Sequence, residues 1–362
     1  MKTRKHLLCL LGAVAAVAFL LLLGVAILTI REYRPDDVEA LTPEGGSKVL
    51  KAGDSISITT YNTGYAGLDK DEDFFMDGGS MVRPDSKEKV EENLAGIADT
   101  LKDLDSDVYF LQEVDRDSKR SYYTDEMVYY EDALDMSGMF ARNFKCDYVP
   151  YPLPPIGKVD SGLVSMTSLN VSSANRISLP ESFSWPIKTC NLKRCMLEMR
   201  IPVEGTKKEL VLINFHLEAY DNGSGKTAQS NILKEKLQEE YEAGNYVIAG
   251  GDFNQTFEDL LETYPLIDTE NWVPQVLNRD SLPEHFSYAL DDTYPTCRLL
   301  NAPYTGSYDT SQVYVLDGFI ISDNVKLQEV KVSDQDFAYS DHQPVKIKVT
   351  LKKTKQNAKE NS

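Results

Sequence analysis

The sequence predicts an α/β domain preceded by one apolar N-terminal helix. Two observations predict the domain: the order strand, helix, strand occurs twice, and polar residues stand at the carboxyl ends of the predicted strands. A third observation, an uncharged run from Leu7 to Ile30, predicts the helix. The chain has 362 residues, 42% hydrophobic and 26% charged, which suits one large domain and leaves room for two.

The N-terminal run LLCLLGAVAAVAFLLLLGVAILTI has 24 residues, more than the roughly 20 that cross a bilayer. A cleaved signal peptide is the competing interpretation, but its apolar core usually spans about 7–15 residues, and no small-residue cleavage site precedes REYRPDD. Lys2, Arg4 and Lys5 precede the run, which places the N-terminus inside and the rest outside the cytoplasm. We expect residues 1–30 to be a cytoplasmic flank and a single-pass membrane anchor.

The first strand, helix, strand unit follows a polar stretch, residues 31–54, that contains Pro35 and Pro43 and predicts a linker. SISITTYN, residues 55–62, predicts a strand. KEKVEENLAGIADTLKDL predicts an amphipathic helix, since apolar residues recur at steps of three and four. DVYFLQEV then predicts a strand that is apolar on both faces until Gln112 and Glu113.

The second unit consists of the strand ELVLINFHL, a helix over residues 226–242 with Gly244 as its cap, and the strand YVIAG. Later strands are expected in VYVLDGFIIS and PVKIKVTL. Residues 120–150 and 257–312, rich in Tyr, Pro, Asp and Asn, predict long loops or short helices. We therefore predict one domain over residues 55–351 and a disordered polar tail over residues 352–362.

Asn62, Glu113, His216 and Asp252 all fall at the ends of predicted strands. In α/β sheets, ligands gather outside the carboxyl ends of strands. In NYVIAGGDFNQTF, Asp252 and Asn254 are two residues apart, so an extended chain points both to the same side. The alternative is a turn held by Asx hydrogen bonds, because Gly, Asp and Asn are ordinary turn residues.

Asp317 is the only charge in the apolar run VYVLDGFIIS. A buried carboxylate needs a cationic or hydrogen-bonding partner, and an aspartate commonly fixes the tautomer of a histidine. We predict a pair between Asp317 and His342 of YSDHQPV; a structural pair with Arg or a backbone turn is the alternative. Glu113, a single carboxylate near amides, is typical of a Mg²⁺ site.

The net charge is −19, and because the first three basic residues contribute +3, the remainder carries −22. Such a surface lacks the basic footprint of a nucleic-acid-binding protein, which disfavours that substrate without excluding it. Cys146, Cys190, Cys195 and Cys297 follow the anchor and match no zinc pattern. A Cys190–Cys195 disulfide and free buried thiols are both open.

The motifs YNTG, LQEV, INFHL, GGDFN, LDGF and SDHQPV occur in an order that resembles the endonuclease/exonuclease/phosphatase superfamily. That superfamily includes deoxyribonuclease-I-like nucleases, apurinic endonucleases, bacterial sphingomyelinases and inositol-polyphosphate 5-phosphatases. The resemblance spans about residues 55–351 and indicates a membrane-anchored, bacterial-type member. It implies a four-layer α/β/β/α sandwich of two mixed sheets, with the site at one edge.

The resemblance also implies a role for each site residue. Mg²⁺, or Mn²⁺ in its place, would be held by Glu113, Asn62 and Asp341, and Asn62 would orient the metal or the phosphate. Asp252 would position the attacking water and Asn254 would hold a phosphate oxygen. His342, supported by Asp317, would contact the scissile phosphate, and His216 would help the leaving group or bind phosphate.

The sequence thus predicts a metal-dependent hydrolase of phosphodiester or phosphomonoester bonds at the membrane, outside the cytoplasm. Anchoring favours phospholipid headgroups as substrate. An extracytoplasmic nuclease is the alternative, although SGLVSMTSLN lacks the basic or aromatic residue that members often have after this strand. A non-catalytic binding domain is a further alternative, and no obligate protein partner is indicated.

Overall fold

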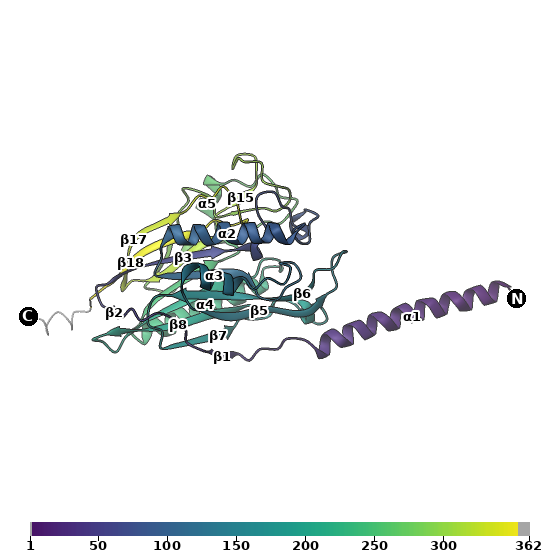
Figure 1. Cartoon of the computed structure of the whole chain (residues 1–362), viewed down its shortest axis with the longest axis horizontal. Helices are drawn as coiled ribbons and strands as arrows, with labels where there is room; N and C mark the ends of the chain where they lie inside the picture. The colour runs from purple at the N-terminus through teal and green to yellow at the C-terminus, as the bar shows by residue number, and fades with distance from the viewer. Residues whose placement is uncertain (1, 354–362) are drawn as a thin grey trace, which may run out of the picture.

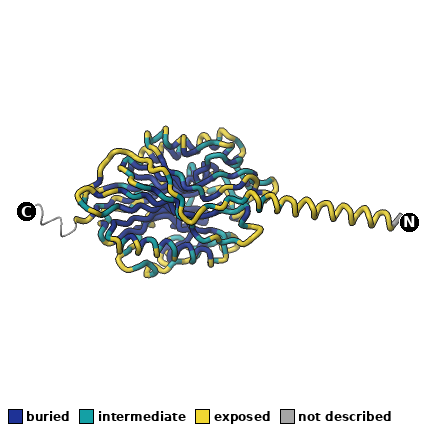
Figure 2. The backbone as a smooth tube through the Cα atoms, turned by 90° about the horizontal axis from the view of Figure 1, so that it is seen from below, coloured by how far each residue is buried: buried dark blue, intermediate teal, exposed yellow. Residues whose placement is uncertain are grey.

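The computed structural model describes residues 2–353 (Figure 1), so nearly all of the predicted tail lies outside the described residues. Helix α1 (Lys2–Ile30) projects from a folded domain. Among the described residues it is the one helix long and apolar enough to cross a membrane, with a mean hydropathy of 2.8 over its most apolar window and none of that window buried. Figure 2 shows the same helix exposed along most of its length, and its last turn is partly covered by the domain.

The domain contains two mixed sheets. In spatial order, the first consists of β1 (Val38–Leu41), β7 (Ser173–Ser178), β8 (Cys195–Glu204), β9 (Glu209–His216), β10 (Tyr246–Asp252), β16 (Asp317–Ser322) and β13 (Phe286–Ala289), with β2 (Leu50–Lys51) paired to β8. The second consists, again from one edge to the other, of β17 (Val325–Val332), β18 (Val345–Leu351), β3 (Ser55–Asn62), β4 (Val108–Asp115), β6 (Gly157–Thr167) and β5 (Gly138–Val149).

Helices cover the outer face of each sheet. Helices α2 (Lys87–Leu104) and α3 (Glu126–Leu134) pack on the second sheet, where Leu94 and Ile97 contact the apolar face around Leu111. Helix α4 (Ser224–Glu242) packs Leu233 and Leu237 on the first sheet. The main core lies between the sheets, so the predicted four-layer α/β/β/α sandwich is confirmed.

Short elements complete the chain: α5 (Glu258–Thr263), β11 (Gln255–Phe257), β12 (Gln275–Leu277), β14 (Cys297–Arg298), β15 (Val313–Tyr314), and the 3-10 turns η1 (Gly64–Ala66), η2 (Phe75–Asp77), η3 (Ile187–Cys190) and η4 (Arg279–Ser281). Local capping fits the sequence. The Ser86 hydroxyl accepts the Lys89 N–H at 3.2 Å at the start of α2. Gly244, at φ +89°, ends α4 by donating its N–H to the Tyr241 carbonyl.

Three sequence predictions need correction. Residues 31–54 are not a free linker throughout, because β1 and β2 pair with β7 and β8 as short additions too brief to show a strand pattern. Residues 138–149, predicted as loop, form β5, whose alternation is interrupted by two register shifts against β6. The run VYVLDGFIIS is two strands, since the Thr296 hydroxyl accepts the N–H groups of Leu316 and Asp317 and separates β15 from β16.

All five cysteines are free in the structure. Cys195 is buried among apolar side chains between the sheets, whereas Cys190 belongs to a separate apolar cluster. The sequence left a Cys190–Cys195 disulfide and free thiols open, and the structure contains free thiols.

The pairing of the strands decides where the polar strand ends meet. Strands β3 and β4 are parallel, as are β9 and β10, and Asp252 lies opposite His216 in the ladder. Strand β16 runs antiparallel to β10 and places Asp317 opposite Asp252. The carboxyl ends of both parallel pairs therefore lie at the same edge of the sandwich.

Candidate active site

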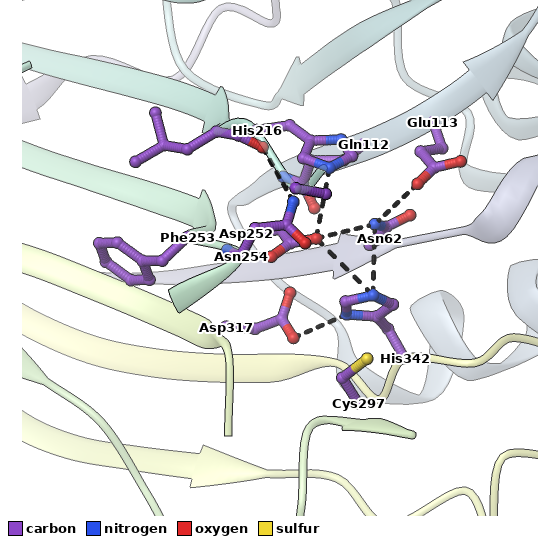
Figure 3. Close-up of polar contacts among 12 residues, drawn as sticks. Asn62, Gln112, Glu113, His216, Asp252, Phe253, Asn254, Cys297, Asp317 and His342 are labelled. Atoms are coloured by element: carbon purple, nitrogen blue, oxygen red, sulfur yellow. Dashed lines mark hydrogen bonds and ion pairs between the residues drawn. The ribbon is translucent and has the colours of Figure 1, made fainter. Parts of the chain in front are cut away.

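The polar strand ends converge at this edge, as Figure 3 shows. Asn62, His216 and Asp252 close β3, β9 and β10, and Asp317 opens β16. All four are buried. Asp341 and His342 reach the same place from the segment before β18, also buried.

Glu113 enters the site through a break in β4. Its backbone has φ +56°, and the register with β6 shifts between Leu111 and Val114. A bulge of this kind commonly re-aims a side chain next to an active site. Glu113 consequently faces the edge of the sheet, where it is half-buried.

Asn62 links two carboxylates. Its Nδ2 lies 3.2 Å from Glu113 Oε1 and 3.1 Å from Asp252 Oδ2, while its Oδ1 accepts the Gly64 N–H at 3.1 Å. The amide nitrogen thus donates toward both acids, and the oxygen is used by the backbone. This arrangement holds the end of β3 against those of β4 and β10.

Asp252 stands between two histidines. Its Oδ2 lies 3.4 Å from His216 Nε2 and 3.6 Å from His342 Nε2, and its Oδ1 accepts the Asn254 N–H at 2.7 Å. Burial raises the pKa of Asp252 to about 7; Asp317 adds to that shift and His342 opposes it. A carboxylate with this pKa exchanges a proton near neutral pH.

The two histidines differ in charge. Burial alone would lower the pKa of His342, but Asp317 and the other acids around it raise that pKa well above 6.5. Nδ1 of His342 lies 2.8 Å from Asp317 Oδ2. For His216, burial together with the positive charges of Arg194 and His342 lowers the pKa well below 6.5. His342 is therefore cationic and His216 neutral at neutral pH.

Two polar atoms of the site have no partner among the described residues: Nδ1 of His216 and Oδ1 of Asp317. A buried polar atom without a hydrogen bond is costly. Asn254, at φ +49°, uses its Nδ2 to donate to the Leu217 carbonyl at 2.8 Å, which fixes its amide at the wall of the site. His216, a residue that lines the cleft, thus has a hydrogen-bonding atom, Nδ1, that no described residue uses.

The acids fit a hard divalent cation. Glu113 and Asp341 line the same cleft, and burial raises the pKa of Asp341 to about 7, with Glu113 adding to the shift. A cation relieves such like-charge crowding, and carboxylate oxygens are the ligands that Mg²⁺ and Mn²⁺ prefer. Cys297 lies close to Asp341 and His342, but burial raises the pKa of its thiol to about 12, which disfavours a soft, thiolate-bound metal.

The site opens into a cleft of about 480 Å³. Its catalytic end contains Glu113, Asp252 and His342, and a long wall is apolar.

The two glycines before Asp252 allow close packing within and between the sheets, and they do not shape the cleft. A Cβ on Gly250 would lie 2.4 Å from the Phe319 ring, and one on Gly251 would lie 1.9 Å from the Phe215 carbonyl oxygen.

Two arginines of the cleft escaped the sequence prediction. Arg120, beside Asp115 of β4, lies over the Tyr65 ring with 3.7 Å to its centroid. Arg194 is buried, donates through Nη1 to the His216 carbonyl at 3.2 Å, and forms an ion pair through Nε with Glu218 Oε2 at 3.4 Å. Both stand in connecting segments without a strand or helix pattern, so only the fold brings them to the cleft, where Asp115 pairs with Arg120 and Glu218 pairs with Arg194.

No family model matches the sequence, and no curated protein matches it. Solved structures define the class of fold. An endonuclease/exonuclease/phosphatase of Beutenbergia cavernae is similar with a TM-score of 0.59 and 18% identity, covering 82% of this chain and 72% of that one. The chain therefore has the endonuclease/exonuclease/phosphatase fold, as the sequence motifs predict.

Two further structures agree. An endonuclease/exonuclease/phosphatase of Bacteroides vulgatus has a TM-score of 0.53 and 15% identity, covering 83% of this chain and all (100%) of that chain. ANGEL2, described as a 2′,3′-cyclic phosphatase and solved with adenosine-2′,3′-vanadate, has a TM-score of 0.54 and 16% identity, covering 83% and 97%.

Proposed function

We propose that this protein is a divalent-metal-dependent hydrolase of phosphoester bonds, above all phosphodiesters, anchored at the membrane with its domain outside the cytoplasm. One observation supports it most: the carboxylate of Asp252, with a pKa of about 7, lies between a neutral and a cationic histidine. This arrangement suits hydrolysis, which needs a proton acceptor for water and proton donors at the phosphate.

Glu113 and Asp341 would hold the cation, with Asn62 beside Glu113. When bound, Mg²⁺ or Mn²⁺ would neutralise charge on the nonbridging phosphate oxygens. Asp252 accepts the proton of the attacking water, because its carboxylate is oriented by the Asn62 amide and the Asn254 N–H.

Cationic His342 donates from Nε2 to a phosphate oxygen, since its Nδ1 is engaged by Asp317. Neutral His216 directs Nε2 toward Asp252 Oδ2, so its unpartnered Nδ1 is a hydrogen-bond acceptor that suits a hydroxyl group of the substrate. Asn254 holds a phosphate oxygen from the wall of the cleft. Arg194 adds a positive charge beside His216.

Phospholipid headgroups are the substrate class that the membrane anchor and the apolar cleft wall favour. A nuclease or nucleotide phosphodiesterase is the second candidate, favoured by the arginines of the cleft and by the cyclic-phosphate activity in ANGEL2's description.

A substrate panel tests the proposal. Purified full-length protein is incubated with sphingomyelin, phosphoinositides, plasmid DNA and a chromogenic phosphodiester, each with Mg²⁺ and with EDTA. We expect Mg²⁺-dependent turnover of the chromogenic ester and of at least one lipid, with loss of activity in Glu113→Gln and His342→Ala. Turnover of DNA alone would support the nuclease, and full activity in both variants would contradict the site assignment.

A further inference from the structure

The end of α1 is fixed on the domain next to the cleft. Leu28 packs on an apolar cluster that includes Phe144 of β5. The Trp185 Nε1–H donates to Thr29 Oγ1 at 3.0 Å, just before the helix ends. Glu32 and Lys193 then form an ion pair at 2.8 Å with side chains only 2% and 4% exposed. These contacts fix the orientation of the domain relative to helix α1.

Five large apolar or aromatic side chains are exposed around this point: Tyr148, Tyr151, Leu153, Trp185 and Ile187, called the apolar rim below. Their exposed fractions run from 51% for Tyr148 to 89% for Leu153. Tyr148 lies near the end of β5, Tyr151 and Leu153 lie in the β5–β6 connection, and Trp185 and Ile187 lie just before and at the start of η3; neighbours of both segments belong to the cluster that Leu28 contacts. A cluster of this kind, unlike a single exposed apolar residue, marks an interaction surface.

The apolar rim is also the mouth of the catalytic cleft. Two of its five residues, Tyr151 and Ile187, line the cleft, together with the less exposed Val149 and Leu192, and His342 lines the same cleft. An apolar path therefore leads from the anchor to the catalytic groups. A water-soluble phosphoester has no need for such a path, whereas a phospholipid has acyl chains that would follow it.

We propose that the apolar rim docks on the leaflet from which α1 emerges, so that the cleft opens onto the bilayer and takes a phospholipid directly from it. This inference rests on the proposed hydrolase function and on membrane anchoring. Trp and Tyr are the side chains that favour the membrane interface. Arg31 and Arg34 at the helix exit are mostly exposed but paired with Asp147 and Glu32, so the apolar and aromatic side chains, and not these charges, support the docking.

Tryptophan quenching tests this geometry, because the chain has only Trp185 and Trp272. In a background carrying Trp185→Phe and Trp272→Phe, single reporters are introduced as Leu153→Trp at the rim, Leu20→Trp within α1, and Glu329→Trp. Glu329 is exposed on β17, at the end of the domain away from α1 in Figure 1. Full-length variants are reconstituted into phosphatidylcholine vesicles with and without brominated acyl chains.

We expect brominated lipid to quench most of the emission at positions 20 and 153 and to leave position 329 unchanged. Quenching at position 20 with none at position 153 would overturn the docking. An unquenched but blue-shifted signal at position 153 would overturn it as well, because it would show that this position is buried against protein and not against lipid. Equal quenching at positions 153 and 329 would also overturn the docking. Absence of quenching at position 20 would show that α1 does not enter the bilayer, and the docking inference would fail with it. Chromogenic phosphodiester hydrolysis in the same vesicles reports the proposed catalytic function separately.

Discussion

Replacing Asp317 by Asn isolates the buried support of His342. The bond from His342 Nδ1 to Asp317 Oδ2 is 2.8 Å long, and the two side chains are 6% and 1% exposed. A hydrogen bond to a charged group in such a site contributes about 1.5–3 kcal/mol. If that energy acts in the transition state, Asp317→Asn lowers kcat about 10- to 150-fold.

The chain contains a matched control on its surface. His285 Nδ1 lies 2.9 Å from Asp323 Oδ2, nearly the same distance, but these side chains are 41% and 52% exposed. Exposed pairs contribute about 0–1 kcal/mol. Asp323→Asn should therefore change the free energy of unfolding, and the activation free energy calculated from kcat, by no more than about 1 kcal/mol.

The free energy of unfolding that His342 contributes should change with pH in one direction. The pKa of His342 is raised in the folded protein above its ordinary 6.5, so the stability it contributes is present below that pH and is lost as pH rises through the folded value. The stability gap between wild type and Asp317→Asn should be largest near pH 6 and shrink in more alkaline buffer. Urea unfolding and kcat at several pH values measure both effects. Equal behaviour of Asp317→Asn and Asp323→Asn would refute the buried-pair account.

Three further predictions concern the metal site and the sheets. Glu113→Gln should weaken Mg²⁺ binding at least about 10- to 100-fold, measured by metal titration of activity; unchanged affinity would remove Glu113 as a ligand. Burial raises the pKa values of Asp252 and Asp341 to about 7, so these acids reduce stability as pH rises from about 4 to 7, and Mg²⁺ should raise Tm more at pH 8 than at pH 5.5. An equal rise in Tm at both pH values would contradict proton–metal competition. Gly251→Ala places a Cβ against the Phe215 carbonyl oxygen and should lower the free energy of unfolding in urea by about 1–3 kcal/mol or more. A variant as stable as the wild type would contradict this close packing between β9 and β10.

The order strand, helix, strand was sufficient to predict an α/β domain because its strong signals coincide with the central elements, whereas the four-layer arrangement followed from the resemblance of the motifs. The predicted strand over residues 55–62 matches β3, and the helix over KEKVEENLAGIADTLKDL matches α2. Weak signals lie at the periphery: β5 is broken by two register shifts, and β1 joins the sheet with only four residues. Strand β5 still buries side chains such as Met139 and Ala141, but its register shifts break the two-residue alternation by which a strand is predicted.

The same distinction applies to the site. Strand-end position groups Asn62 with the end of β4, and His216 with Asp252, since parallel strands end at one edge; the stacking of the two sheets then brings Asn62 to Asp252. The bulge that turns Glu113 toward them could not be predicted, because it depends on the register between β4 and β6. Arg194 reaches the cleft from the segment before β8, and only tertiary packing brings it beside His216.

Hydrolysis of a chromogenic phosphodiester by full-length wild type and by Asp252→Asn, each with Mg²⁺ and with EDTA, tests the central claim most directly. The proposed function predicts turnover by wild type with Mg²⁺, its loss in EDTA, and its loss in Asp252→Asn at an unfolding midpoint that still shows a folded protein. Turnover that persists in folded Asp252→Asn, or that ignores EDTA, would contradict a metal-dependent site built on the end of β10.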